Sequence, residues 1–160
     1  WQWNCTGYSR KRANLQQYLI NNEQPNVILL QETNTKAKLS GYRSFNETTP
    51  RDKPAVATLV QRNLTVTPHE IKQDTIPHLL LQIVPTKKRD DSLFILNVYS
   101  SPRRNHRFLA LLKKVFRIAD NRAVLVAGDF NAHHAAWGYK YETLKERYLW
   151  EDSQQESLAL

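Results

Sequence analysis

The chain has 160 residues, which is enough for one domain or for part of a larger one. Hydrophobic residues make up 41% of it, but no apolar run approaches the ~18 residues of a transmembrane helix, so a membrane-spanning protein is excluded. Cys5 is the only cysteine, which excludes a disulfide framework and a cysteine-based zinc module. The 23 Lys and Arg outnumber the 15 Asp and Glu, and this net charge of +8 favours a polyanion such as nucleic acid as the partner, the alternative being a basic surface that only keeps the protein soluble.

Four short apolar segments that are rich in β-branched residues and bounded by turn residues or charges are predicted as buried strands, at residues 27–30, 55–60, 93–99 and 123–127. Further strands are predicted at residues 1–4, which alternate apolar and polar, at 64–67 as a hairpin partner, and at 75–84. Helical periodicity occurs in other stretches, namely residues 9–20, residues 101–119 and the segment from residue 143 onward. Because several strands follow one another between residues 55 and 99, this order predicts an α/β sandwich rather than a repeated βαβ array.

The second predicted helix has the widest apolar face of the predicted helices. Ser101-Pro102 suits its beginning, because proline is favoured at the first helical position. Its apolar stripe extends from Phe108 to Ala119. The third helix is predicted to begin with a capping box at Thr143, in which the threonine and a glutamate three residues later satisfy the first backbone N–H groups.

Polar side chains follow the predicted strands at the points where these strands end. In open α/β sheets, ligand sites gather at the carboxyl ends of strands. A carboxylate next to a buried strand is also costly unless it is paired, hydrogen-bonded or bound to a cation. Each residue taken alone has a structural explanation, such as a turn, a helix cap or a core tyrosine. Their joint placement after separate strands nevertheless predicts a functional site made of Asn4, Glu32, Tyr99, Asp129 and Asn131.

The chemistry of these side chains suits phosphodiester hydrolysis. Oxygen ligands with no thiols and few nearby imidazoles are the ligands of Mg²⁺ or Mn²⁺. A metal held by one carboxylate neutralises the scissile phosphate, while a second carboxylate takes a proton from the attacking water. Amide and phenol groups would hold the phosphoryl oxygens. Clustered basic residues, among them Arg103 and Arg104, would follow the nucleic-acid backbone.

The adjacent His133 and His134 suggest a zinc site as an alternative. Neighbouring residues in a loop rarely both face one metal ion, and no cysteine pair or HExxH motif accompanies them. We therefore expect these histidines to line the substrate groove, the alternative being a polar loop without a role. Trp137 and Trp150 could stack on bases, and we favour packing for Trp150 on the third predicted helix.

Several short motifs follow one another along the chain. They are Trp3-Asn4, Leu30-Gln31-Glu32-Thr33, Asn97-Val98-Tyr99-Ser100-Ser101-Pro102 and Gly128-Asp129-Phe130-Asn131-Ala132-His133-His134. In this order they resemble the endonuclease/exonuclease/phosphatase superfamily, which includes apurinic/apyrimidinic endonucleases and pancreatic DNase-like enzymes. Together with Ala136-Trp137-Gly138, they are most similar to the endonuclease domain of non-LTR (LINE-type) retrotransposons. The resemblance covers essentially the whole chain.

The resemblance implies a DNase I-like four-layer α/β sandwich, with two facing mixed sheets and helices outside. It assigns the metal to Glu32, with Asn4 beside the metal and the phosphate. Tyr99 would contact the scissile phosphate. Asp129 would orient or deprotonate the attacking water, and Asn131 would hold that aspartate and the phosphate. The implied cofactor is Mg²⁺ or Mn²⁺, and the implied partner is DNA, which the enzyme would nick at a target site.

A Ser-Asp-His motif, which closes the sequences of this superfamily, does not occur in residues 1–160. We therefore expect a partial domain that is incomplete at its C-terminus and weakly active or inactive alone, with a reverse transcriptase domain downstream in the full-length protein. Without a basic-then-apolar leader, an intracellular location is expected, and the nucleus suits the implied function. Two alternatives stay open: a phosphatase of the same superfamily, and a non-catalytic remnant that binds nucleic acid by charge.

Overall fold

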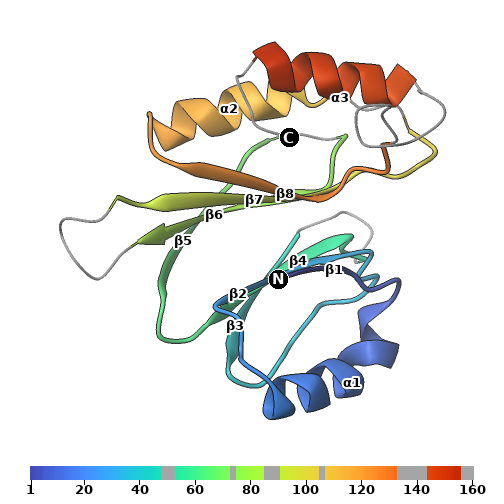
Figure 1. Cartoon of the computed structure of the whole chain (residues 1–160), viewed down its shortest axis with the longest axis vertical. Helices are drawn as coiled ribbons and strands as arrows, with labels where there is room; N and C mark the ends of the chain where they lie inside the picture. The colour runs from blue at the N-terminus through green and yellow to red at the C-terminus, as the bar shows by residue number, and fades with distance from the viewer. Residues whose placement is uncertain (48–52, 73–74, 85–90, 105–106, 133–143, 156–160) are drawn as a thin grey trace.

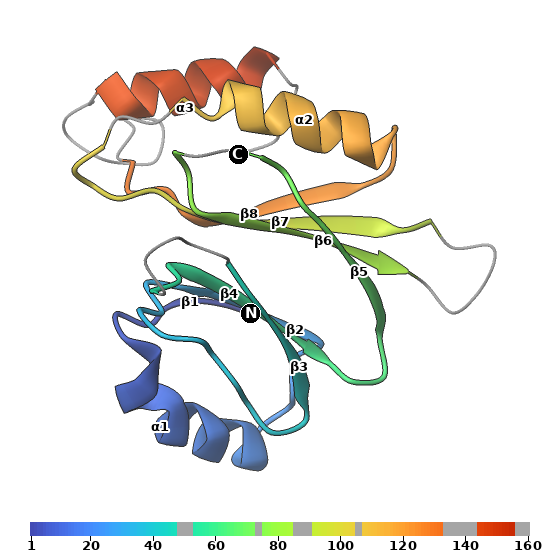
Figure 2. The ribbon, with the colours of Figure 1, turned by 180° about the vertical axis from the view of Figure 1, so that it is seen from behind.

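The computed structural model describes residues 1–47, 53–72, 75–84, 91–104, 107–132 and 144–155. Within these residues the strands form two four-stranded sheets that lie face to face (Figure 1). Helix α1 (Tyr8–Asn21) covers the outer face of one sheet, and α2 (Leu109–Ala119) and α3 (Leu144–Gln155) cover the outer face of the other, as both views show (Figures 1 and 2). The fold is therefore the expected four-layer α/β sandwich.

The first sheet combines a parallel strand pair with antiparallel neighbours. Its order is β1-β2-β4-β3, formed by β1 (Gln2–Asn4), β2 (Val27–Gln31), β4 (Val56–Gln61) and β3 (Tyr42–Asn46). β1 and β2 run parallel, whereas β4 runs antiparallel to both β2 and β3. The sequence did not predict β3, because its residues Tyr-Arg-Ser-Phe-Asn lack both a continuous apolar run and a regular apolar–polar alternation.

The second sheet has a parallel pair at its end as well. Its order is β5-β6-β7-β8, formed by β5 (Thr65–His69), β6 (His78–Val84), β7 (Leu93–Tyr99) and β8 (Val124–Asp129). β7 and β8 are parallel, and the other neighbours are antiparallel. The predicted strands are confirmed with small shifts at their ends. The largest shift concerns β6, which begins at His78 instead of three residues earlier, and β8 extends through Asp129 instead of ending two residues before it.

Each sheet has its own apolar core on the side that faces the helices. Leu15 and Leu19 of α1 pack with Ile28 and Leu30 of β2 in the first core. In the second, apolar side chains of α2 and α3 pack against β6 and β7. Each core holds one sheet to the helices that cover it. In the described part of the chain, no helix has the length and apolar content needed to cross a membrane.

Helix α2 begins later than the sequence predicts. The predicted helix covers residues 101–119, but α2 begins at Leu109. Before it, a turn is closed by the N–H of Arg104, which donates to the carbonyl oxygen of Ser101 at 3.1 Å. The sequence rule that favours proline at a helix start was therefore wrong at Pro102. The predicted capping box of the third helix lies outside the described residues.

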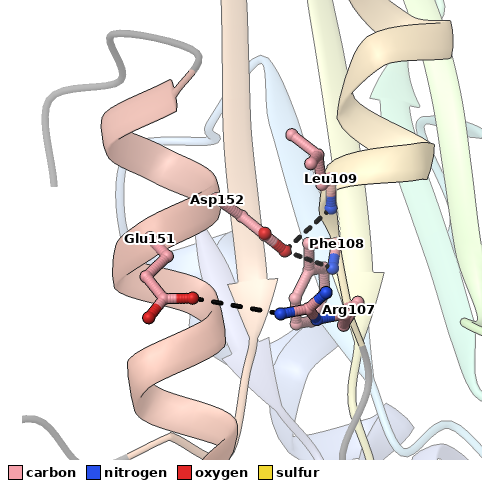
Figure 3. Close-up of polar contacts among 5 residues, drawn as sticks. All are labelled: Arg107, Phe108, Leu109, Glu151 and Asp152. Atoms are coloured by element: carbon pink, nitrogen blue, oxygen red, sulfur yellow. Dashed lines mark hydrogen bonds and ion pairs between the residues drawn. The ribbon is translucent and has the colours of Figure 1, made fainter.

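The start of α2 is determined by a side chain from another helix. No side chain at its own N-terminus caps it, and its first turn has no acidic residue. Instead, the buried Asp152 of α3 accepts hydrogen bonds at its Oδ2 from the N–H groups of Phe108 and Leu109, both at 2.8 Å (Figure 3). A carboxylate at a helix N-terminus is favourable because the free N–H groups there carry positive partial charge.

Replacing Asp152 with asparagine should lower the free energy of unfolding by about 1–2 kcal/mol, because the charged acceptor of two backbone N–H groups becomes neutral. Urea denaturation followed by circular dichroism would measure the change. Glu151→Gln is the matched control, since Glu151 forms only an exposed ion pair with Arg107 at 3.9 Å and such pairs contribute little (Figure 3). Equal stability of the two variants would contradict the capping role of Asp152.

Candidate active site

The parallel pairs of the two sheets lie against each other, and their carboxyl ends meet. β1 contacts β8 across the sandwich, where Gln2 Nε2 donates to the carbonyl oxygen of Gly128 at 2.7 Å. Parallel strands end at the same edge of a sheet, so the side chains that close β1, β2, β7 and β8 converge. The structure therefore brings together the five predicted residues Asn4, Glu32, Tyr99, Asp129 and Asn131, all of them half-buried.

Asn4 joins the two carboxylates of the site. Its Nδ2 donates to Glu32 Oε1 at 3.0 Å and to Asp129 Oδ2 at 2.6 Å, so one amide group contacts two acidic residues from different sheets. Its Oδ1 accepts from the backbone N–H of Thr6 at 3.1 Å and from the Thr6 hydroxyl at 3.2 Å. Thr6 is a positioning residue that the sequence analysis missed, and its two hydrogen bonds favour the orientation in which the Asn4 nitrogen faces the carboxylates.

Tyr99 donates its hydroxyl proton to Glu32 Oε1 at 3.1 Å. Burial, together with the negative charges of Glu32 and Asp129, raises the pKa of Tyr99 to about 12. The phenol therefore keeps its proton at neutral pH and acts as a hydrogen-bond donor rather than as a base. A donor in this position suits a phosphoryl oxygen as well as the carboxylate it now contacts.

Asp129 is held from several directions. Its Oδ1 accepts from the backbone N–H of Asn131 at 3.0 Å, and its backbone carbonyl accepts from the N–H of Ser100 at 2.8 Å. Asn131 Nδ2 in turn donates to the carbonyl oxygen of Ser100 at 3.0 Å. Glu32 and Asn131 have left-handed φ angles of 52° and 47°, which are uncommon for non-glycine residues and concentrate at functional sites. The carboxylate is therefore held rigidly by the chain around it.

A polar link between the sheets lies beneath the site, and the sequence analysis did not identify it. The fully buried Gln31 donates through Nε2 to Asn97 Oδ1 at 2.7 Å. Asn97 Nδ2 donates to the carbonyl oxygen of Ala57 at 3.0 Å and to Thr58 Oγ1 at 3.2 Å. A buried amide needs such partners, so this network fixes how the sheets register against each other. Its signal in the sequence was one polar residue inside an otherwise apolar strand.

Gly128 allows β8 to approach β7 beside the site. Its φ is 154°, and a Cβ atom there would lie 2.0 Å from the carbonyl oxygen of Val98. Because that contact is with backbone, no side-chain rotation would relieve it. Glycine is therefore required immediately before Asp129. The motif Gly128-Asp129 contains this glycine, but the sequence did not show why it is needed.

The donor set suits a hard divalent cation. The carboxylates of Glu32 and Asp129 and the carbonyl oxygen of Asn4 are all oxygen ligands, which Mg²⁺ and Mn²⁺ prefer. Among the described residues, no group of three or more His, Cys, Asp or Glu side chains surrounds one point, so most coordination positions would fall to water and substrate. Asn4 presents its nitrogen to the carboxylates, so its amide would have to rotate for its oxygen to bind a metal.

The predicted substrate-binding residues divide into two groups. Arg103 and Arg104 are exposed in the turn that follows Tyr99, at the rim of the site. His133 and His134 lie outside the described residues, as does Trp137. Trp150 is half-buried on α3, which covers the sheet face away from the site.

Comparison with known proteins identifies the class to which this fold and site belong. Residues 1–150 match the model of the Endonuclease/Exonuclease/phosphatase family, and the chain belongs to this family. The family predicted from the sequence motifs is thereby confirmed. A comparison with curated protein sequences found no match.

Similar solved structures agree on the fold. The endonuclease domain of TRAS1, a telomere-specific non-LTR retrotransposon, has a TM-score of 0.78 and 19% identity, covering 96% of this chain and 68% of that one. ANGEL2, a 2′,3′-cyclic phosphatase, has a TM-score of 0.56 and 18% identity, covering 81% and 47%. A conserved protein of unknown function from Enterococcus faecalis V583 has a TM-score of 0.53 and 14% identity, covering 90% and 64%. The chain thus spans about half to two-thirds of these structures.

Proposed function

We propose that this chain carries the catalytic centre of a divalent-metal-dependent endonuclease that nicks DNA. The observation that supports this most strongly is the contact of the Asn4 amide with the Glu32 and Asp129 carboxylates, at 3.0 and 2.6 Å, beside the Tyr99 hydroxyl. Two carboxylates with neutral donors between them form a site that can take a cation and a phosphodiester together.

Each residue has a separate role in the proposed reaction. Glu32, with the carbonyl oxygen of a rotated Asn4, would hold Mg²⁺ or Mn²⁺, and a metal bound there neutralises charge on the scissile phosphate. Asp129, held by the N–H of Asn131, accepts a proton from the attacking water. The Tyr99 hydroxyl and the Asn131 amide donate to phosphoryl oxygens, where negative charge increases in the transition state.

DNA is the proposed substrate because the chain has a positive net charge and exposed arginines follow the strand that carries Tyr99, and both features favour a long polyanion. The net charge is +8, and the exposed Arg103 and Arg104 lie beside the end of β7 that carries Tyr99. The similarity to the TRAS1 endonuclease domain agrees with this substrate. We extend the proposal to a target-site nick made in the nucleus by a longer polypeptide with a reverse transcriptase domain downstream.

A phosphatase is the second candidate, and the similarity to ANGEL2 supports it. Both reactions need a metal, a water activated by a carboxylate and donors to phosphoryl oxygens, so the site residues do not distinguish them. The distribution of charge distinguishes a nuclease from a phosphatase. A small phosphorylated substrate has no use for cations beyond the site, whereas a polynucleotide contacts them along its backbone.

The test is nicking of supercoiled plasmid by the full-length polypeptide in the presence of Mg²⁺. We expect nicking to stop when the metal is chelated and to fall by about a hundredfold or more in Glu32→Gln, because the substituted amide binds a divalent cation weakly. Glu23→Gln is the control, since it removes an exposed carboxylate after α1. In a thermal shift assay, Mg²⁺ should stabilise the parent more than Glu32→Gln.

Other outcomes would replace the proposal with one of its alternatives. Phosphate release from small phosphorylated compounds without nicking would favour the phosphatase. Binding of DNA without any metal-dependent cleavage would favour a non-catalytic nucleic-acid-binding remnant. Nicking that persists in a chelator, or is equal in Glu32→Gln and the parent, would remove Glu32 from the mechanism.

A further inference from the structure

A basic pocket next to the candidate active site has no role in the mechanism above. The pocket has a volume of about 220 Å³ and is lined by Tyr8, Ser9, Arg12, Lys36 and Lys38. We propose that it binds a backbone phosphate of the nucleic acid, a few nucleotides away from the phosphodiester that is cleaved. This inference rests on the proposed nuclease function for its substrate, and it adds a binding site that the catalytic residues do not define.

The walls of the pocket continue directly from two residues of the active site. One wall is the start of α1, which follows β1 and Asn4, and the other is the segment that follows Glu32. Two backbone hydrogen bonds tie the walls together, from Gly7 N to the carbonyl oxygen of Glu32 at 2.7 Å and from Tyr8 N to that of Thr33 at 2.9 Å. The pocket is therefore attached to the same chain segments that position Asn4 and Glu32.

Contacts between side chains and backbone keep the pocket in shape. The buried Tyr8 donates its hydroxyl to the carbonyl oxygen of Lys38 at 2.6 Å. The Ser9 and Thr35 hydroxyls lie 3.0 Å apart across the gap between the walls. These two hydroxyls are exposed and can also donate to an anion, since a hydroxyl hydrogen rotates to suit its acceptor.

The positive charge around the pocket favours the binding of an anion. Arg12, Lys36 and Lys38 are exposed around it, and no carboxylate is among the residues that line it. The ion pair found among the described residues joins Arg107, which precedes α2, to Glu151 of α3, so it lies in the helical layer that covers the other sheet (Figure 3). Like charges gathered on one concave surface repel one another, and a bound phosphate relieves that repulsion while accepting hydrogen bonds from them.

The pocket lies close enough to the active site for one polynucleotide to occupy both. Lys36 is four residues after Glu32, so their Cα atoms lie at most about 14 Å apart, because an extended chain advances about 3.3–3.6 Å per residue. Phosphates of a duplex strand advance by about 3.4 Å each along the helix axis, and their separation is larger because the strand also winds around that axis. A phosphate within a few nucleotides of the scissile one can therefore reach the pocket.

The experiment measures DNA affinity as a function of salt, by fluorescence anisotropy of a labelled duplex without metal. Compared with the parent, Lys36→Gln/Lys38→Gln should bind DNA three- to tenfold more weakly at low salt. The negative slope of log K against log salt should become shallower by about 1. Lys113→Gln/Arg117→Gln removes the same charge from the exposed face of α2 and is the matched control. All four side chains are exposed, so thermal unfolding should stay unchanged.

Nicking kinetics provide a second readout that separates this inference from the proposed function. With plasmid as substrate, the pocket variant should raise KM and leave kcat unchanged, because the pocket holds a phosphate that does not react. Salt dependence equal to that of the control variant, or an affinity for inorganic phosphate that the variant loses without any change in DNA binding, would overturn the inference. A parent that binds DNA but never nicks it would overturn the proposed function and leave the pocket assignment standing.

Discussion

In the full-length polypeptide, Asp129→Asn should lower plasmid nicking by about a thousandfold, while the affinity for DNA changes by about twofold or less. Asp129 is assigned to accept the proton of the attacking water, and an asparagine cannot accept one. The substituted amide keeps a similar shape and an oxygen that can still accept from the N–H of Asn131, now 3.0 Å from Asp129 Oδ1. The loss should therefore fall on kcat and not on binding.

Nicking rates and duplex affinity measured on the same preparations test this expectation. Asp120→Asn is a suitable control, because Asp120 is an exposed residue at the C-terminus of α2 and the change in charge is identical. Full nicking by Asp129→Asn would remove Asp129 from the mechanism. A proportional loss of DNA affinity would instead indicate that Asp129 supports the fold of the substrate-binding rim.

Gly128→Ala should have the largest effect of any conservative change near the site. The new Cβ would lie 2.0 Å from the carbonyl oxygen of Val98, in a backbone conformation with φ 154° that other residues rarely adopt. Overpacking against backbone and the strained φ together should lower the free energy of unfolding by about 3 kcal/mol. Because β8 must move away from β7, Asp129 should also be displaced and nicking should be lost.

Urea denaturation and the nicking assay would be compared for Gly128→Ala and Gly41→Ala. Gly41 also has a positive φ, 83°, but no atom lies within 4 Å of a Cβ built there. Its substitution should therefore cost only about 1–2 kcal/mol of stability, from the backbone conformation alone, and should leave nicking intact. Similar losses for the two variants would show that close approach of the strands is not what requires Gly128.

The position of the site follows from the topology of the sandwich. Each sheet has one parallel pair, β1 with β2 and β7 with β8, and these pairs lie on the same flank. Antiparallel neighbours would carry their terminal side chains to opposite edges, whereas parallel neighbours carry them to one edge. Two such edges stacked on each other can place four strand ends around one point, and the polar residues of the motifs occupy those ends.

The local sequence determined the strands, the polar residues that close them and the family. An apolar β-branched run such as that of β7 favours a buried strand, and the desolvation cost of carboxylates that follow several separate strands indicates a functional site. The motif around Asp129 therefore identified the catalytic candidate before any contact was known.

Only the tertiary structure decided which of these residues meet and what supports them. Asn4 and Asp129 are 125 residues apart in the chain, and no local preference encodes their 2.6 Å contact. The start of α2 depends on Asp152 of another helix, and the strand β3 exists because it pairs with β4. These features depend on hydrogen bonds and packing between segments distant in sequence, whose energies outweigh the weak local propensities from which a sequence is interpreted.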